Sequence, residues 1–185
     1  MDELILRRIA EVSPENLADF TCGSPSLDDF LKEQALVYDQ AGLTLTTIVF
    51  VEDDPQPVAY FSLSGDNLKL SSTERLELSL NFEVPIKSFP SVKITRLAVA
   101  TKFQSAGIGA YLIELVEGIV FESSVAARLL TVDADNNERT LNFYTKLKFV
   151  ESLENAKNRE NIAAQKKIIE KPETISMYKD IYLEE

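Results

Sequence analysis

The sequence predicts a mixed α/β fold of the α+β type, in which flanking helices cover a central, mostly antiparallel sheet. Two observations lead to this prediction. β-Branched and aromatic runs at 46–51 and 58–64 flank a short proline-containing connection, which is typical of an antiparallel hairpin. From residue 92 onward, strand and helix patterns alternate, as they do in a strand–helix–strand crossover unit. With 185 residues, the chain is expected to form one domain over 1–185.

The first half of the chain supplies a strand, two helices and the hairpin. We expect a strand at 3–10, a short helix at 14–20 and a longer helix that starts after an N-cap at Ser26 and ends at Gly42. The longer helix has an apolar face at helical spacing, made of Leu27, Phe30, Leu31, Ala35 and Tyr38. After the hairpin, two prolines indicate a loop-rich passage over 66–90, with one short helix or edge strand.

The second half supplies the crossover unit and the closing strands. The expected elements are strands at 92–99, 128–134, 149–153 and 174–182, and helices from Ile108, at 136–147 and at 154–171. The last helix is highly charged, so we expect it to be exposed. The last strand, at 174–182, fits an exposed edge of the sheet that could pair two copies of the chain as a homodimer, and the sequence leaves the oligomeric state open.

Composition excludes several kinds of chemistry. The chain has no histidine and one cysteine, Cys22, which excludes triads with a histidine base, histidine-bound metals and structural zinc. We therefore expect no metal. No apolar run is long enough for a membrane span, and the N-terminus lacks the apolar core of a secretory signal. Because a lone cysteine fits a reducing compartment, we predict a cytoplasmic protein without a membrane partner.

The charge balance bears on partners. The chain carries 19 basic and 30 acidic residues, a net charge of −11. A net-acidic protein repels phosphate backbones at long range, so we expect nucleic-acid binding to be disfavoured, although a local basic patch stays compatible with this balance.

One loop carries the clearest chemical signal. A strand pattern runs into a short loop with Gly107 and Gly109, and a helix pattern starts immediately afterwards. The glycines let a ligand approach the backbone closely, and the unpaired amides of the first helical turn form an anion site together with the helix dipole. The loop lacks the Gly-Lys-Ser/Thr of a P-loop, and Leu112 stands where a dinucleotide-binding fingerprint needs glycine.

The segment Gln104-Ser-Ala-Gly-Ile-Gly fits the pattern Gln/Arg-x-x-Gly-x-Gly/Ala and resembles motif A of the GNAT acetyltransferases. Further matches follow in the family's order: Arg96-Leu-Ala-Val, Leu129-Leu-Thr-Val-Asp-Ala, and Asn137 seven residues before Tyr144. Residues 20–35 are similar to the N-terminal signature of a GNAT subgroup that includes toxins of toxin–antitoxin pairs, which acetylate aminoacyl-tRNA.

Two positions depart from the family pattern. Ala106 stands where the family often has a basic residue, so one pyrophosphate contact is expected to be missing. Lys148 stands where the family usually has glycine, so the turn after the helix at 136–147 is expected to differ.

The resemblance implies an N-acetyltransferase that uses acetyl-CoA as cosubstrate, in which an amine attacks the thioester directly. It implies that the loop amides bind the pyrophosphate and that the backbone at 97–99 polarises the thioester carbonyl. Tyr144 would be the general acid, with an unperturbed pKa near roughly 10, and Asn137 would hydrogen-bond the pantetheine arm or the pyrophosphate. The predicted cofactor-binding residues are Leu97, Ala98, Val99, Gln104, Ser105, Ala106, Gly107, Ile108, Gly109, Ala110 and Asn137.

Structural explanations stay open for several of these positions. Tyr144 also fits a core aromatic residue. Cys22 fits a small buried apolar residue better than a nucleophile, because no histidine exists to activate it. Arg96 fits an ion pair with a neighbouring carboxylate, and Asp133 and Asp135 fit either a substrate cleft or helix caps.

Three functions follow. The first is N-acetylation of a primary amine in a small molecule or a protein, and the acidic balance favours a cationic acceptor. The second is a toxin activity that acetylates aminoacyl-tRNA, which the net charge disfavours. The third is a non-catalytic module that binds acyl-CoA.

Overall fold

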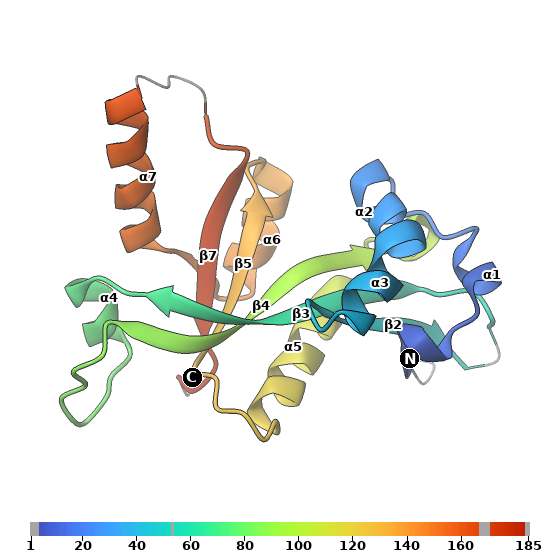
Figure 1. The fold of residues 1–185 in the computed structure, drawn as a ribbon, viewed down its shortest axis with the longest axis horizontal. Coiled ribbons are helices and arrows are strands. Elements are labelled where there is room, and N and C mark those ends of the chain that lie inside the picture. Colours follow the sequence, from blue (N-terminus) through green and yellow to red (C-terminus); the bar gives the residue numbers. More distant parts are fainter. Residues whose placement is uncertain (1–3, 53, 167–170, 184–185) are drawn as a thin grey trace. The chain divides into compact units, whose positions relative to one another are not determined.

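The computed structural model describes residues 4–52, 54–166 and 171–183. The chain forms two compact units: unit 1 comprises Met1–Ser64 and Ile94–Leu115, and unit 2 comprises Gly65–Lys93 and Val116–Glu185. Strands β3 (Ala59–Lys69) and β4 (Ser88–Val99) and helix α5 (Ile108–Phe121) contribute residues to both units (Figure 1). The seven strands follow the order β1-β2-β3-β4-β5-β7-β6. The single domain over 1–185 stays a prediction.

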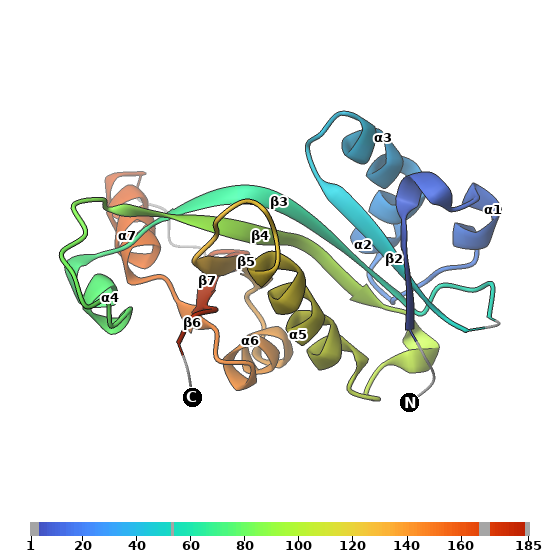
Figure 2. The ribbon, with the colours of Figure 1, turned by 90° about the horizontal axis from the view of Figure 1, so that it is seen from below.

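Unit 1 is built on antiparallel strands and covered by short helices. Strand β1 (Leu4–Arg8) pairs with β2 (Leu45–Val51), which pairs with β3, and the second pairing confirms the predicted hairpin. The helical elements are η1 (Ile9–Glu11), α1 (Pro14–Leu17), α2 (Pro25–Asp29), the π-helical turn η2 (Phe30–Gln34) and α3 (Ala35–Gln40). Figure 2 shows α1, α2 and α3 on one side of β2, where their apolar residues meet the strand.

The predicted helix at 26–42 differs from the structure in two ways. It begins at Pro25 with Ser24 as the N-cap residue, because proline has a fixed φ that suits the first helical position. The helix is also interrupted by the π-helical turn, which divides it into three elements.

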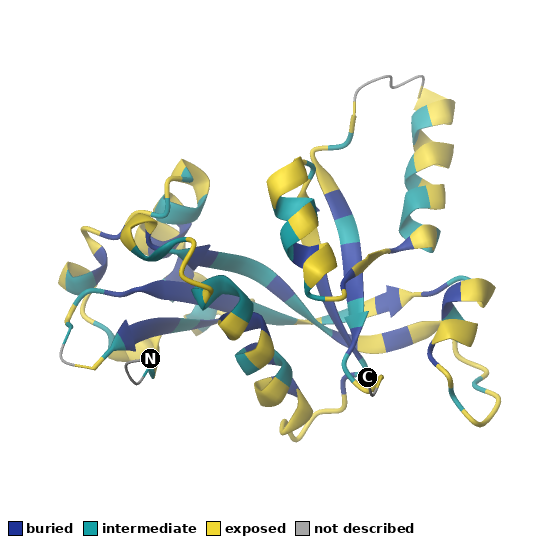
Figure 3. Cartoon of the chain, turned by 180° about the vertical axis from the view of Figure 1, so that it is seen from behind, coloured by how far each residue is buried: buried dark blue, intermediate teal, exposed yellow. Residues whose placement is uncertain are grey.

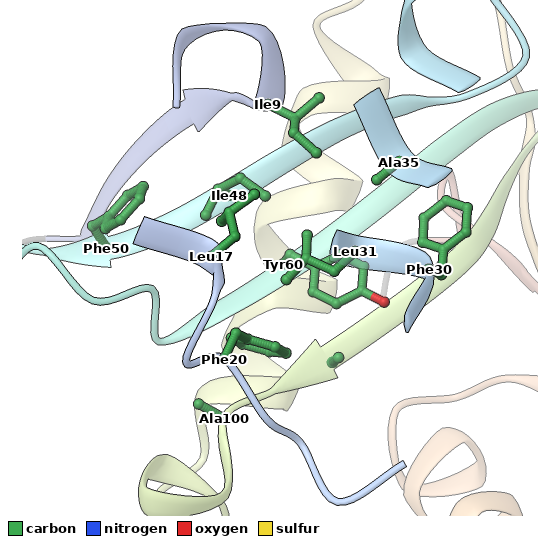
Figure 4. Packing of buried hydrophobic residues seen from close by; sticks show 11 residues of the cluster. Ile9, Leu17, Phe20, Phe30, Leu31, Ala35, Ile48, Phe50, Tyr60 and Ala100 are labelled. Atoms are coloured by element: carbon green, nitrogen blue, oxygen red, sulfur yellow. The ribbon is translucent and has the colours of Figure 1, made fainter. Parts of the chain in front are cut away.

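The core of unit 1 lies between these helices and the sheet. Figure 4 shows side chains from α1, η2 and α3 converging on Ile48 and Tyr60. Phe20 contacts Tyr60 edge to face at 5.6 Å between ring centroids. The Tyr60 hydroxyl donates to the Leu27 carbonyl at 2.8 Å, so a polar group in this core has its partner.

Unit 2 contains the second half of the predicted crossover. Its elements are α4 (Ser72–Glu77), β5 (Leu129–Asp135), α6 (Glu138–Lys146), β6 (Val150–Glu151), α7 (Leu153–Lys166) and β7 (Thr174–Asp180). The Arg128 amide donates to the Pro90 carbonyl at 2.8 Å, and Lys93 pairs with Asp133 at 2.5 Å. Residue numbers thus rise together along β4 and β5, so these strands run in the same direction. The β4–α5–β5 crossover is confirmed.

Several predicted boundaries in unit 2 were wrong. Strand β3 continues to Lys69 and β4 starts at Ser88, so only the two ends of the expected loop at 66–90 are strand, and the short helix expected within it is α4. The expected helix at 154–171 is α7, which carries no buried residue and is largely exposed in Figure 3; residues 167–170 of that prediction lie outside the described residues.

The predicted edge strand at 174–182 is also corrected. Strand β7 pairs antiparallel with β5 along seven residues and with β6 on its other side. The strand therefore lies inside the sheet, and its backbone groups are used by both neighbours. Among the described helices, none has the length and apolarity needed to cross a bilayer.

Candidate functional site

The loop before α5 has an unusual backbone. Strand β4 ends at Val99, a single 3-10 turn, η3 (Thr101–Phe103), follows, and the chain then passes through Ser105 with φ 65° and Gly107 with φ 82°. Both values lie in the left-handed region, which disfavours residues with a side chain. A Cβ built on Gly107 would meet no atom within 4 Å, so the space beside this glycine is open. The glycine meets a backbone requirement and leaves room for a ligand.

The amides of this loop are available to an anion. Residues 105–110 donate no backbone hydrogen bond to any carbonyl of the described chain, and the first helical bond runs from the Tyr111 amide to the Gly107 carbonyl at 3.1 Å. These amides precede and open a helix of 14 residues, whose dipole favours negative charge at this end. These amides are therefore available to an anionic group such as a phosphate.

Gln104 has a structural role that its place in the motif did not reveal. Its side-chain Nε2 donates to the Cys22 carbonyl at 2.8 Å and to the Val99 carbonyl at 3.0 Å. The Thr101 amide donates to the Thr21 carbonyl at 2.9 Å, which adds a second tie to the same N-terminal stretch. The start of the loop is thus fixed by residues about 80 positions earlier, a contact that sequence spacing gave no means of finding.

The end of β4 lies beside this loop in the chain and belongs to the same unit. Ala98 is buried in the core of unit 1, and Leu97 and Val99, which are half-buried, alternate with it and occupy the other face. The polarising role of the backbone at these three positions stays a prediction.

Tyr144 is held by the end of helix α6. The Phe149 amide donates to the Tyr144 carbonyl and the Lys148 amide to the Thr145 carbonyl, both at 3.0 Å, which is the Schellman arrangement. The Phe149 ring lies against the Tyr144 ring at 5.3 Å between centroids. This motif needs a left-handed residue, and Lys148 takes φ 69°. The turn expected to differ because of Lys148 therefore keeps the geometry that glycine would give.

The environment of Tyr144 corrects one prediction and supports another. Burial, and secondarily the Asp135 carboxylate, raise the pKa of its hydroxyl above the ordinary value, so the pKa is not unperturbed. The side chain is 7% exposed, and its hydroxyl has no hydrogen-bond partner among the described residues. A phenol in this state stays protonated at neutral pH and has a proton to donate.

Asn137 is the N-cap of α6. Its Oδ1 accepts from the Thr140 amide at 2.9 Å, and its backbone amide donates to the Asp135 carbonyl at 2.7 Å. The side-chain oxygen holds the cap, and the Nδ2 group is left to donate to a ligand.

The structure gives the surroundings of three residues whose roles the sequence left open. Burial and hydrogen bonding to Asp28 raise the pKa of the Cys22 thiol to about 11, which favours a structural role. Arg96 lies over the Phe30 ring at 4.7 Å and donates to the Thr95 carbonyl, in place of the expected ion pair. Asp133 pairs with Lys93.

The predicted site residues form two groups. Unit 1 contains the strand end at 97–99 and the loop at 104–110, and unit 2 contains Asn137 and Tyr144. Within the described ranges, no cluster of three potential metal ligands occurs.

Comparison with known proteins identifies the family of this chain. The model of the acetyltransferase (GNAT) family matches residues 9–149. A tRNA-acetylating toxin of Mycobacterium tuberculosis is 27% identical over 135 residues, which cover 71% of this chain and 76% of the toxin.

Solved structures of toxins share the fold. A tyrosine-to-phenylalanine variant of the AtaT toxin superposes with a TM-score of 0.72 at 21% identity, over 98% of this chain and 91% of that one. AtaT complexed with acetyl-methionyl-tRNAfMet gives 0.71 at 21% identity, over 96% and 95%.

Proposed function

The chain belongs to the acetyltransferase (GNAT) family and is an acetyl-CoA-dependent N-acetyltransferase, and we propose that its acceptor is the α-amino group of an aminoacyl-tRNA. The use of acetyl-CoA is supported by one observation above all: the backbone amides of residues 105–110 are unpaired among the described residues, and such an array fits a pyrophosphate. The acceptor part is supported by the similarity to a toxin that acetylates tRNA and to the fold of AtaT, which has been solved with an acetylated aminoacyl-tRNA.

The net charge of −11 does not weigh against this acceptor as strongly as the sequence indicated. Net charge is a sum over the chain, whereas phosphate contacts depend on the local surface. Lys146 and Lys148, which follow Tyr144 closely, are both exposed, and neither pairs with a carboxylate of the described residues. We propose that these two cations contact acceptor phosphates beside the general acid.

Different residues would bind the cosubstrate, polarise its carbonyl and donate the proton. When bound, acetyl-CoA supplies an acetyl group activated as a thioester. The amides at 105–110 would hold its pyrophosphate, and those at 97–99 would donate to the carbonyl that develops negative charge. The acceptor amine would attack the thioester carbon without a covalent enzyme intermediate, and as the C–S bond breaks the Tyr144 hydroxyl would give its proton to the departing sulfur. The proton that the nitrogen loses would pass to solvent, from which the phenol regains one. Asn137 would orient α6 and, through Nδ2, contact the cosubstrate.

The first test identifies the acceptor. Purified protein with radiolabelled acetyl-CoA is offered methionyl-tRNA, the same tRNA without its amino acid, spermidine and a lysine-rich peptide. We expect label only on methionyl-tRNA, or on other aminoacyl-tRNAs included in a wider panel. Label on spermidine or the peptide, with none on any aminoacyl-tRNA, would leave the acetyltransferase in place and overturn the acceptor.

A second test addresses Tyr144. Tyr144→Phe keeps the ring and its contact with Phe149 and removes the proton donor, so we expect kcat to fall about 10²- to 10⁴-fold while the Kd for acetyl-CoA stays unchanged. Because its folded pKa lies above the unfolded value near 10, the hydroxyl keeps its proton as the pH rises from 7 to 10. The wild-type rate should therefore show no loss from Tyr144 ionisation in that range. An unchanged kcat in the variant would remove Tyr144 from the mechanism.

A further inference from the structure

Unit 2 contains a pocket that the acetyl-transfer site does not use. It has a volume of about 330 Å³, within the range of small-molecule and side-chain binding pockets. Its walls come from α4 and from the segment that leads to β4, and they are mainly apolar: Leu76, Leu80, Phe82, Val84 and Phe89. All lining residues belong to residues 72–89, so the pocket is a local feature of unit 2.

Arg75 is the cation of this pocket. Its Nε is buried and has no hydrogen-bond partner, and its guanidinium makes no ion pair with any carboxylate of the described residues. A buried donor without an acceptor costs free energy, and a ligand that supplies the acceptor relieves this cost.

The neighbouring carboxylates of Glu74 and Glu83 form no ion pair with Arg75. Glu74 is 1% exposed and accepts from the amides of Ser71 and Leu153, both at 2.8 Å, so its charge is committed elsewhere. Glu83 lines the pocket but is exposed and forms no ion pair with Arg75. The free guanidinium therefore selects for an acceptor group that comes from outside the unit.

The rim of the pocket is apolar and exposed. Leu76 is 81% exposed and Phe82 is 70% exposed, and Ile86, on the same segment, is 47% exposed. Large apolar side chains that stay in water at this level mark an interaction surface when they gather around a cavity. Their extent beyond the pocket favours a peptide segment over a free small molecule.

We propose that this pocket is a docking site for a partner protein segment that inserts a large apolar side chain and presents an adjacent carboxylate to Arg75. Leu80, Val84 and Phe89 take up the side chain by burial of apolar surface, and the guanidinium fixes the segment's orientation by a charge-assisted hydrogen bond. Charge complementarity decides the occupant, because an apolar segment without a carboxylate leaves Arg75 unpaired. The site is independent of the acceptor proposed for acetyl transfer.

The test uses a matched pair of probes, N-acetylphenylalanine and N-acetylphenylalaninamide. They share the apolar side chain and differ only in the carboxylate. Each is titrated to 20 mM into methyl-labelled full-length protein, and the resonances of Leu80 and Val84 are followed by NMR. We expect both probes to shift these resonances and the acid to bind at least fivefold more tightly than the amide. Acetyl transfer is measured in parallel and should not change.

Three variants distinguish the contributions. Arg75→Gln should make the acid bind no better than the amide, and Leu80→Ala should weaken both. Arg7→Gln in unit 1 makes the same change in net charge and should leave the preference for the acid intact.

Three outcomes would overturn the proposal. They are no shift with either probe, equal affinity of the two probes in the wild type, and shifts that follow protein concentration without probe. The last outcome would assign the surface to contact between two copies of this chain.

Discussion

The starts of helices α5 and α7 solve the same physical problem in opposite ways. The first amides of any helix lack intrahelical acceptors. At α7 the chain provides acceptors itself: Glu74 accepts from the Leu153 and Glu154 amides, and the Ser152 hydroxyl accepts from the Asn155 amide. At α5 the amides of residues 105–110 have no acceptor among the described residues. The amides of the closed helix start, that of α7, are satisfied by protein groups, and those of the open helix start, that of α5, are not.

The difference lies in the residues that precede each helix. The segment before α7 is reached by a buried carboxylate, which carries the negative charge that the helix dipole favours. The loop before α5 has no acidic residue and contains two positions with left-handed φ, which turn successive amides outward. In the proposed function the cosubstrate would supply the negative charge at this helix start. The comparison predicts that changes at α5 alter ligand binding, whereas changes at α7 alter stability.

The largest expected effect is at the open helix start. Gly107→Glu places a carboxylate where the pyrophosphate is proposed to bind, and like charges repel each other at this site. We expect at least a 100-fold loss of acetyl-CoA affinity, about 2.8 kcal/mol, measured by calorimetry.

Its control is Gly107→Ala. A Cβ at this position meets no atom within 4 Å, so alanine adds the backbone strain of φ 82° without a charge. We expect less than a tenfold loss of affinity. Equal affinity for the wild type and both variants would show that the loop is only a structural turn.

The second effect is at the closed helix start. Glu74→Gln replaces one acceptor oxygen with a donor that faces backbone amides, so we expect the free energy of unfolding to fall by about 2 kcal/mol. Acetyl-CoA affinity should not change. Glu77→Gln removes an exposed carboxylate on the same helix and should stay within about 0.5 kcal/mol of the wild type. Chemical denaturation measures both, and a loss of affinity in Glu74→Gln would contradict the division between the two helix starts.

The two helix starts also show how far the sequence alone leads. The open start was predicted because the glycines of residues 104–109, and the helix pattern that follows them at once, are local features of the sequence. The closed start was not, because Glu74 lies 79 residues before Leu153, and only folding brings them together. The same reason explains the missed contact from Gln104 to Cys22. The edge assignment of 174–182 failed likewise, because strand order depends on long-range pairing.

A third prediction concerns the start of helix α6, which the protein caps and which is also proposed to contact the cosubstrate. Asn137 caps α6 through Oδ1 and is also proposed to contact acetyl-CoA through Nδ2. Asn137→Ala should lower the free energy of unfolding by about 1 kcal/mol, since the cap is lost. Asn137→Asp keeps the cap and removes the donor, so it should preserve stability and weaken acetyl-CoA binding.

Denaturation and calorimetry on both variants separate the two roles of Asn137. If Asn137→Asp binds acetyl-CoA as the wild type does, the residue is a cap and nothing more, and its place in the family motif reflects the helix start alone.

The smallest effect is expected at the other end of α6, where the backbone also sets the requirement. Lys148 holds the left-handed position of the Schellman motif at φ 69°, a conformation that costs a residue with a Cβ about 1 kcal/mol. Lys148→Gly should therefore raise the free energy of unfolding by about 0.5 kcal/mol, after the extra entropy of glycine in the unfolded chain is subtracted. Lys146→Gly removes the same side chain from the last helical turn and should lower it by about 0.5–1 kcal/mol.

A common sign for these two variants would contradict the strain argument. If the signs differ, Lys148 is a strained residue at the end of the helix that carries Tyr144. The variant Lys148→Asn then tests whether the charge of Lys148 binds the acceptor, because asparagine tolerates the left-handed conformation and carries no charge. A higher KM for aminoacyl-tRNA in both Asn and Gly variants, with kcat unchanged, would assign the ammonium to the acceptor phosphates.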